Sequence, residues 1–499
     1  MPQREPLSGV DNAWRRLGET NNLMTITGML MFEETVTYEE VCDRLEERLL
    51  RFERFKMRVG GQKRRLLPPY WELVEDFDIE NHVYDLSLPE PDDKAAFQRF
   101  IGTLMSRPLD ERRPVWEAFL LEDAGPDDGN AVAFRIDHSI GDGFALMHVM
   151  LGLVDNPGEL EFPIGGIHPP DWSDLDDGAD VAEDAVANGG PAASAPEAAE
   201  ADEAVTDNPK ETASTGVSDA DVEGETADDG GGLDELREKH QPSDVWDSIS
   251  LAGKGLKAGY DLLTLSEEAD TSLVGELGPT KRAAWTKRVD LEEVKTVGNA
   301  HDATVNEVLL ATTAGAIRRV LDGRGEDTSS LELHCTMPVN LKPMDERPES
   351  LGNYFGITFV PLPVGTEDLV ERIDMVNEQV DLQTAGIEAY LMYQLLRVGG
   401  RVPETLQRAI QRHFHDRATG IVTNVPGPLN KATFAGKEVS DLIFWVPQGN
   451  DQGLGISIIS YGGTVRVGVA SDANLLPDPT EMTDAFEAEI DDLVAQANE

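Results

Sequence analysis

The most informative part of the chain is AFRIDHSIGDGFALMHVM, Ala133 to Met150. An apolar run leads into Asp137 and His138, a Ser-Ile-Gly-Asp-Gly sequence follows, and an apolar periodic pattern resumes at Phe144. The apolar run predicts a buried strand, the glycines predict a turn, and the segment after them predicts a helix. We therefore expect the histidine at the exit of a strand, where a substrate can reach it.

His138 has two interpretations on the residues alone. An imidazole titrates near neutral pH, so His138 is a candidate general base that takes a proton from a hydroxyl or a thiol. It could equally be a hydrogen-bonded loop histidine that caps the helix. A Ser-His-Asp triad is disfavoured, because Ser139 adjoins the histidine and the chain has no Gly-x-Ser-x-Gly elbow.

Asp142 follows the histidine by four positions and is flanked by Gly141 and Gly143. The carboxylate need not contact the imidazole, and we expect it to fix the loop, through an arginine that the sequence does not identify. The two glycines suit a positive backbone φ or a close approach of helix and loop. We expect Gly143 to allow close packing behind the base.

Charge is the unusual feature of the composition. The 499 residues carry a formal net charge of -52, and residues 171–240 alone hold 22 acidic against three basic residues. The rest of the chain is acidic as well, and concentrated salt would screen the resulting self-repulsion. We interpret this as adaptation to a salt-rich cytoplasm, with an acidic interaction protein as the alternative. No basic face is left for nucleic acid.

Neither a secretory signal nor a membrane span is expected. The first residues lack an apolar core, and no segment reaches the roughly 20 apolar residues that cross a bilayer. Cys42 and Cys335 are far apart and lie in no metal-binding spacing. His413 and His415 lack a third ligand at suitable spacing, so no metal site is predicted. We expect a cytoplasmic protein that is soluble or peripheral at a membrane.

The chain divides into three zones. Residues 1–165 and 246–499 alternate strands and helices, whereas residues 166–245 are too poor in apolar residues to offset chain entropy and are predicted to be a disordered acidic linker. Two layered α/β halves are therefore expected. Helices are predicted over 37–55 and over 304–321, where Thr304 and Glu307 form a capping box. Strands are predicted at 24–33, 131–137, 332–341, 354–364 and 454–472, the last a hairpin that turns at Gly462-Gly463.

DHSIGDG resembles the His-His-x-x-x-Asp-Gly motif of the wax ester synthase/diacylglycerol acyltransferase family, within the coenzyme-A-dependent acyltransferase and condensation-domain superfamily. The first histidine is replaced by Asp137, and the second, which the family uses as the base, is His138. Further stretches follow in the family's order and cover nearly the whole chain outside the linker. They are PLSGVDNAWRRLGETNNLMTITGMLMFE, RPVWEAFLLED with Pro114 and Trp116 of a Pro-Leu-Trp motif, TVNEVLLA with Asn306 of an Asn-Asp motif whose aspartate is Glu307, MPVNLKPMDERPESLGNYFG, and TNVPGP from Thr423 to Pro428.

The resemblance implies two chloramphenicol-acetyltransferase-like halves with a tunnel between them. His138 would take the proton of an alcohol as its oxygen attacks an acyl thioester, and would return it to the departing thiolate. Candidate donors to the oxyanion are Asn306, Thr423 and Asn424. For Trp116, which follows Pro114 closely, packing in the core or the tunnel wall is the expected role.

The implied function is an O-acyltransferase that moves a long acyl chain from acyl-coenzyme A, as co-substrate, to diacylglycerol or a long-chain alcohol, with no bound cofactor. Association with a membrane or a lipid droplet would fit such substrates. One alternative is a condensation-type transferase that uses carrier-protein thioesters. Another is a non-catalytic lipid-binding relative that keeps the fold.

Overall fold

The computed structural model describes residues 4–18, 20–61, 69–88, 93–122, 124, 129–162, 268–342, 351–379, 382–407, 414, 417–449 and 452–497. The predicted linker, 166–245, and the histidine pair at 413 and 415 lie outside these residues. No helix in the described ranges is both long and apolar enough to cross a bilayer.

The first sheet is six-stranded and carries the predicted motif. Its order is β13 (Thr433–Phe434), β14 (Lys437–Trp445), β2 (Thr25–Phe32), β7 (Ala131–Asp137), β6 (Trp116–Glu122) and β5 (Val83–Ser87). All neighbouring strands are antiparallel except one parallel pair, β5 with β6. Alternate residues of β2, β6 and β7 point to opposite faces of the sheet. One face packs with α2 (Tyr38–Arg48) and α4 (Gly143–Leu153), and the other packs with α3 (Lys94–Met105).

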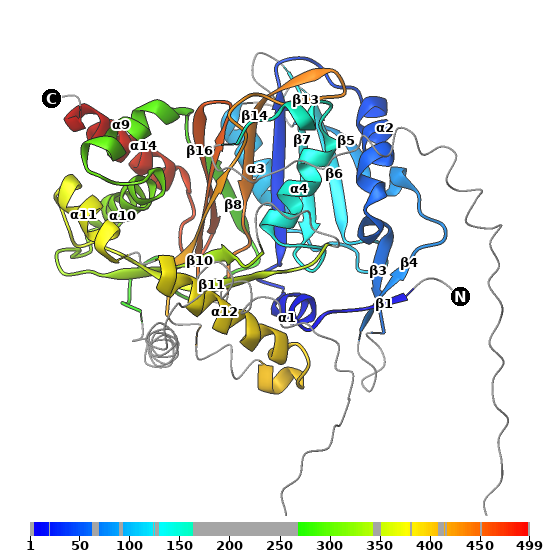
Figure 1. Cartoon of the computed structure of the whole chain (residues 1–499), viewed down its shortest axis with the longest axis horizontal. Coiled ribbons are helices and arrows are strands. Elements are labelled where there is room, and N and C mark those ends of the chain that lie inside the picture. The colour runs from blue at the N-terminus through cyan, green and yellow to red at the C-terminus, as the bar shows by residue number, and fades with distance from the viewer. Residues whose placement is uncertain are drawn as a thin grey trace, which may run out of the picture. The chain divides into compact units, whose positions relative to one another are not determined.

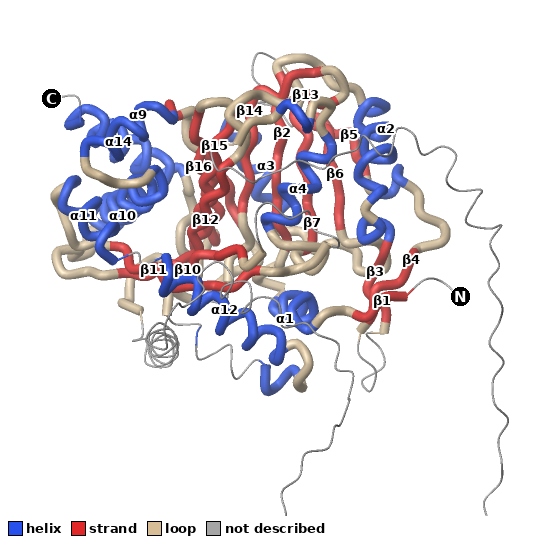
Figure 2. The backbone as a smooth tube through the Cα atoms, in the orientation of Figure 1, coloured by secondary structure: helices blue, strands red, loops and turns tan. Residues whose placement is uncertain are grey.

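The second sheet is seven-stranded, and helices α9, α10, α11 and α14 cover one of its faces (Figures 1 and 2). These helices span Leu291–Ala300, Val305–Gly323, Leu369–Gln379 and Thr480–Ala497. A third, three-stranded sheet is formed by β1 (Arg4–Pro6), β4 (Tyr70–Leu73) and β3 (Met57–Gly60). The order of the second sheet is β11 (Phe355–Leu362), β10 (Leu333–Asn340), β12 (Gly420–Pro426), β15 (Leu454–Tyr461), β16 (Thr464–Asp472) and β8 (Lys281–Trp285), with β9 (Val289–Asp290) also on β16.

A strand from the predicted C-terminal half joins the sheet of the N-terminal half. β14 belongs to residues 246–499 by sequence, but it pairs with β2, from Val439 opposite Phe32 to Trp445 opposite Thr27. In Figure 1 this orange strand stands beside the blue β2. The boundary drawn along the sequence therefore does not separate the two sheets.

Most predicted elements are confirmed. Thr304 and Glu307 form the capping box of α10, and β15 turns into β16 at Gly462-Gly463, both at positive φ. The helix predicted over 37–55 ends earlier, at Arg48, and short 3-10 turns follow. Tertiary packing accounts for the difference, because Phe55 is fully buried edge-on against Trp116, 5.9 Å between ring centroids.

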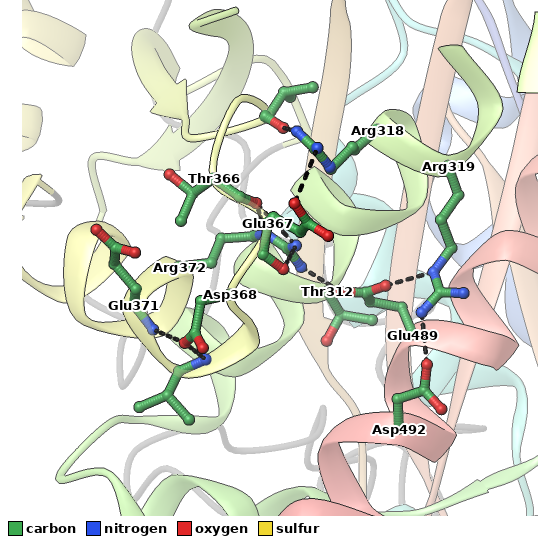
Figure 3. Close-up of polar contacts among 12 residues, drawn as sticks. Thr312, Arg318, Arg319, Thr366, Glu367, Asp368, Glu371, Arg372, Glu489 and Asp492 are labelled. Carbon is green, nitrogen blue, oxygen red and sulfur yellow. Dashed lines mark hydrogen bonds and ion pairs between the residues drawn. The ribbon is translucent and has the colours of Figure 1, made fainter. Parts of the chain in front are cut away.

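A buried ion-pair network joins α10, α11 and α14 (Figure 3). Arg372 pairs with Glu489, and both side chains are buried. Glu489 also accepts from Arg319 Nε at 2.5 Å, and Arg319 Nη2 donates to Asp492 at 2.6 Å. Gly315 of α10 leaves room for the pair of Arg372 and Glu489, because a Cβ at Gly315 would collide with both side chains.

Candidate active site

His138 is the first residue after β7, as predicted. Its backbone N–H donates to Met24 O at 2.8 Å, which ties the end of the strand to the segment before β2. The turn is closed by Asp137, whose Oδ1 accepts from the backbone N–H of Ser139 at 2.9 Å and from its hydroxyl at 2.5 Å. The residue that replaces the family's first histidine thus shapes the turn that presents the second.

Two aromatic rings that also pack on each other contact the imidazole. Trp14 of α1 (Gly9–Leu17) stacks on it at 4.8 Å between centroids and an interplanar angle of 15°, and Phe355 lies 5.4 Å away. Only 8% of His138 is exposed. Burial disfavours the charged ring and lowers the pKa of His138 to about 4, so the imidazole is neutral at pH 7. A neutral imidazole is the form that can accept a proton.

Asn353 holds one ring nitrogen of His138. The distance from His138 Nδ1 to Asn353 Oδ1 is 2.9 Å. The amide nitrogen of the same side chain donates to the carbonyl of His138 at 2.9 Å and to Asp11 Oδ1 at 2.8 Å. Asp11 Oδ1 also accepts from the backbone N–H of Asn353 at 3.1 Å. Residues from three distant parts of the sequence therefore meet at His138.

Asp142 fixes the loop, but by backbone contacts. As N-cap of α4 it accepts from Ala145 N–H at 2.8 Å through Oδ1, and from Tyr354 N–H at 2.7 Å through Oδ2. Burial raises the pKa of the Asp142 carboxyl. Among the described residues the recorded partners of the carboxylate are these two amides, one of them at a helix N-terminus, and the arginine partner stays a prediction.

Of the two glycines that flank Asp142, Gly141 is the one that lies in close contact with neighbouring residues. A Cβ at Gly141 would lie 3.2 Å from Ala145 Cβ and 3.8 Å from the backbone of Gly352, whereas one at Gly143 would meet nothing within 4 Å. Neither glycine has a positive φ. The packing role predicted for Gly143 is therefore wrong, and the tight position lies two residues earlier.

A cavity of about 160 Å³ opens beside His138. Both halves contribute to it, and its wall is almost entirely apolar, with Thr336, Gln407 and Gln452 as polar exceptions. α12 (Leu382–Gly399) provides one side. The other lining residues are Ala13, Trp14, Leu17, Met24, Pro338, Phe355, Ile357, Phe359, Met392, Leu395, Leu396, Gly399, Phe414, Ile421, Val446, Pro447 and Gly449.

The predicted oxyanion donors are brought together but do not line this cavity. Asn424 Nδ2 donates to Asn306 Oδ1 at 3.1 Å, and Thr423 is buried on β12. Ile421, two residues before Thr423, is the part of β12 that reaches the cavity wall. Their role at the oxyanion stays a prediction.

Trp116 is a core residue, as its packing interpretation predicted. It is 1% exposed, its indole N–H donates to Phe55 O at 2.8 Å, and it stacks on His82 at 4.7 Å. Pro114 lies beside it, since its carbonyl accepts from Trp116 N–H. Neither residue is in the cavity wall that the structure describes.

Sequence reasoning missed Asp11, Trp14 and Asn353. Asp11 and Trp14 lie in PLSGVDNAW and Asn353 in SLGNYFG, stretches that carried the resemblance but received no role. The sequence pointed to these residues only in that both stretches occur in the same order along the chain as in the family that it resembles. Contact between residues 342 positions apart is a product of the fold.

Comparisons with known proteins agree on one family. Residues 7–222 match a family model described as the wax ester synthase/diacylglycerol acyltransferase catalytic domain, and residues 351–494 match the WS/DGAT C-terminal domain. A Mycobacterium tuberculosis relative named as a probable diacylglycerol O-acyltransferase, tgs1, is 26% identical over 446 residues, which cover 87% of this chain and 84% of the relative. Wax ester synthase/diacylglycerol acyltransferase 3 of Arabidopsis thaliana is 28% identical over 46% of this chain and 52% of its own length.

Solved structures show the same fold. The wax ester synthase/diacylglycerol acyltransferase from Marinobacter aquaeolei VT8 superposes with a TM-score of 0.64 at 18% identity, covering 99% of this chain and all of that one. The first condensation domain of the calcium-dependent antibiotic synthetase gives 0.56 at 14% identity, covering 99% and 96%. The expected two-halved acyltransferase fold is confirmed.

Proposed function

Because the chain belongs to the wax ester synthase/diacylglycerol acyltransferase family, we propose that it moves a long acyl chain from acyl-coenzyme A to diacylglycerol or a long-chain alcohol, with His138 as general base. The chain is an acyltransferase by family. One observation carries the role of His138: a neutral, buried imidazole stands in the wall of an apolar cavity to which both halves contribute.

In the proposed reaction His138 moves one proton. The imidazole takes the proton of the acceptor hydroxyl while that oxygen attacks the thioester carbonyl carbon. The resulting tetrahedral intermediate collapses, the carbon–sulfur bond breaks, and the imidazolium returns the proton to the leaving thiolate. No acyl-enzyme forms, so the reaction needs no serine or cysteine nucleophile.

The cavity wall suits the substrates that we propose. Each buried methylene of an alkyl chain contributes about 0.8 kcal/mol on transfer from water. Leu395, Leu396 and Phe359 offer such a surface without competing hydrogen-bond donors. The same wall excludes water, which would otherwise hydrolyse the thioester.

A peripheral position at a lipid surface is part of this proposal. Val398 follows the cavity-lining Leu396 on α12 and is 55% exposed, and Leu406, next to the cavity-lining Gln407, is 50% exposed. Large apolar residues exposed beside an apolar cavity support delivery of the water-insoluble acceptor from a membrane or a lipid droplet.

Acceptor-dependent thiol release tests the proposal. Purified protein in molar salt, given palmitoyl-coenzyme A, should release coenzyme A thiol and form ester only when hexadecanol or dioleoylglycerol is present. His138→Ala should lower this rate by ~10³-fold, within the usual range for a general base. His148→Ala is the matched control, because that ring is also 8% exposed but lies outside the cavity wall.

Three results would contradict the proposal. If the wild-type chain releases no coenzyme A thiol in response to an acceptor, the proposed function is wrong. A wild-type rate in His138→Ala would show that His138 is not the general base. Equal losses of rate in His138→Ala and His148→Ala would show the same.

A further inference from the structure

The amide of Asn353 has only one orientation that satisfies its neighbours. Its Nδ2 lies 2.8 Å from Asp11 Oδ1 and 2.9 Å from the carbonyl of His138, and both of these oxygens only accept. An NH₂ group donates twice, so both of its hydrogens are used. The amide oxygen must then be the atom that faces the ring of His138.

The amide oxygen, together with the backbone carbonyl of His138, which also accepts from the ring, decides where the ring carries its proton. Asn353 Oδ1 accepts and cannot donate, and it lies 2.9 Å from His138 Nδ1. A neutral imidazole has one N–H and one lone-pair nitrogen. His138 Nδ1 is therefore the protonated nitrogen, and Nε2 keeps the lone pair.

Asp11 is itself held from several sides. It stands in the first turn of α1, where its backbone N–H donates to the N-cap Ser8 at 3.0 Å. Its Oδ2 lies 3.6 Å from Arg54 Nη1, and Arg54 stacks on Trp71 at 4.6 Å. Asp11 is 3% exposed and Arg54 is 7% exposed. A buried carboxylate with a fixed position can thus fix the amide that it binds.

We propose that Asn353 and Asp11 are positioning residues that keep His138 in the Nδ1–H tautomer, with Nε2 as the proton-accepting atom. This inference rests on the proposed function insofar as His138 is the base. Neither residue is in the cavity wall, so both act through the histidine. Asp11 holds the amide, the amide holds the ring, and the ring receives the proton of the acceptor.

Removal of the amide gives the first test. Asn353→Leu keeps the approximate size of the side chain and deletes all of its hydrogen bonds. We expect kcat to fall by ~10²-fold with KM within about threefold of wild type, because the base is present but no longer held in one tautomer. Asn130→Leu is the matched control, since Asn130 is equally buried, at 3%, and donates to Val36 O at 2.7 Å away from the cavity wall.

A double-variant cycle gives the second test. Asp11→Leu removes the carboxylate that holds the amide of Asn353, and we expect it to lower kcat by less than Asn353→Leu does. The double variant Asp11→Leu/Asn353→Leu should lose no more kcat than Asn353→Leu alone, because Asp11 acts through the amide. Two independent structural roles would not produce this non-additivity.

Nitrogen NMR of protein labelled with ¹⁵N-histidine reads the tautomer directly, with His138→Gln assigning the resonance among nine histidines. Wild type should show a protonated Nδ1 at pH 7, and Asn353→Leu should show a mixture. An Nε2–H tautomer in wild type, or an unchanged tautomer and kcat in Asn353→Leu, would overturn the inference. If wild type transfers no acyl group, the proposed function fails while the NMR signal still decides the tautomer.

Discussion

A residue that accepts a proton at neutral pH must be unprotonated before its substrate arrives. His138 meets this condition through its surroundings: two aromatic rings exclude water, and its hydrogen-bond partner Asn353 is uncharged. A carboxylate in the place of Asn353 would favour the imidazolium and raise the pKa. The nearest carboxylate in this network, Asp11, is one amide further away.

The lowered pKa of His138 makes stability depend on pH. The pKa is about 4 in the folded chain and about 6.5 in the unfolded chain, so between these values only the unfolded chain takes up the proton. Stability is therefore lost as pH falls through this window. The free energy of unfolding should drop by about 2 kcal/mol more for wild type than for His138→Gln between pH 7 and pH 5.

Urea titrations at the two pH values measure this difference. Asp137 and Asp142, whose pKa values are raised by burial, contribute with the opposite sign, but they are present in both proteins and cancel. Parallel pH profiles for wild type and His138→Gln would show that the folded chain protonates the ring as readily as the unfolded one.

Single residues could be predicted from sequence when the signal was local. The apolar run and the glycines correctly placed His138 at a strand exit, and the family's motif made it the candidate base. Asn353 and Trp14 left no local signal, because their contacts with His138 arise from packing across 215 and 124 positions of sequence. The amides of Ala145 and Tyr354 that bind Asp142 left no local signal either, since Tyr354 is distant in sequence.

At the scale of elements, α10 depends on one position without a side chain. Gly315 faces the buried pair of Arg372 on α11 and Glu489 on α14, and Arg319 of α10 also binds Glu489. A charged pair out of water is stabilising only while its geometry is intact, since an unpaired buried charge costs several kcal/mol. The glycine is therefore required here despite its low helix propensity.

Gly315→Ala should lower the free energy of unfolding by about 3 kcal/mol, because the methyl group displaces the ion pair. Gly323→Ala on the same helix is the control, since a Cβ there meets nothing within 4 Å and alanine should stabilise by about 0.5–1 kcal/mol. Denaturant unfolding of both variants checks the prediction. Equal effects at the two positions would mean that the network does not constrain Gly315.

Elements were predictable where short-range patterns determine them. Strand-like apolar segments identified β2 and the β15–β16 hairpin, and the capping box fixed the start of α10. Two outcomes needed the whole fold. Phe55 leaves the expected helix to fill the core beside Trp116, and β14 pairs with a strand from the other half, which no pattern within KEVSDLIFW specifies.

At the scale of the whole molecule, an apolar cavity lies in a chain of net charge -52. Many basic residues are already paired, such as Lys281 with Asp472 and Arg466 with Asp441. The unpaired acidic excess repels itself, and the folded state concentrates this charge more than the unfolded state does. Salt should therefore favour folding.

Raising KCl from 0.1 M to 2 M, which shortens the Debye length from about 10 Å to a few ångströms, should raise Tm by about 10 °C. Differential scanning calorimetry measures the shift, and sucrose of equal osmolality controls for exclusion of co-solvent from the surface. A Tm that falls with KCl would show that pairs such as Lys287 with Asp491 contribute more than the general repulsion. A rise that sucrose reproduces would rule out screening as its cause.

Because β14 pairs with β2, the first sheet cannot be completed until late in synthesis. A ribosome that has released β2, β6 and β7 must still translate residues 138–436 before β14 emerges, which takes tens of seconds at roughly 5–20 residues per second. During this interval β2 is an open edge that another nascent polypeptide could join. Messages truncated before codon 437 should thus yield insoluble product, and supplying the missing fragment in trans should recover it.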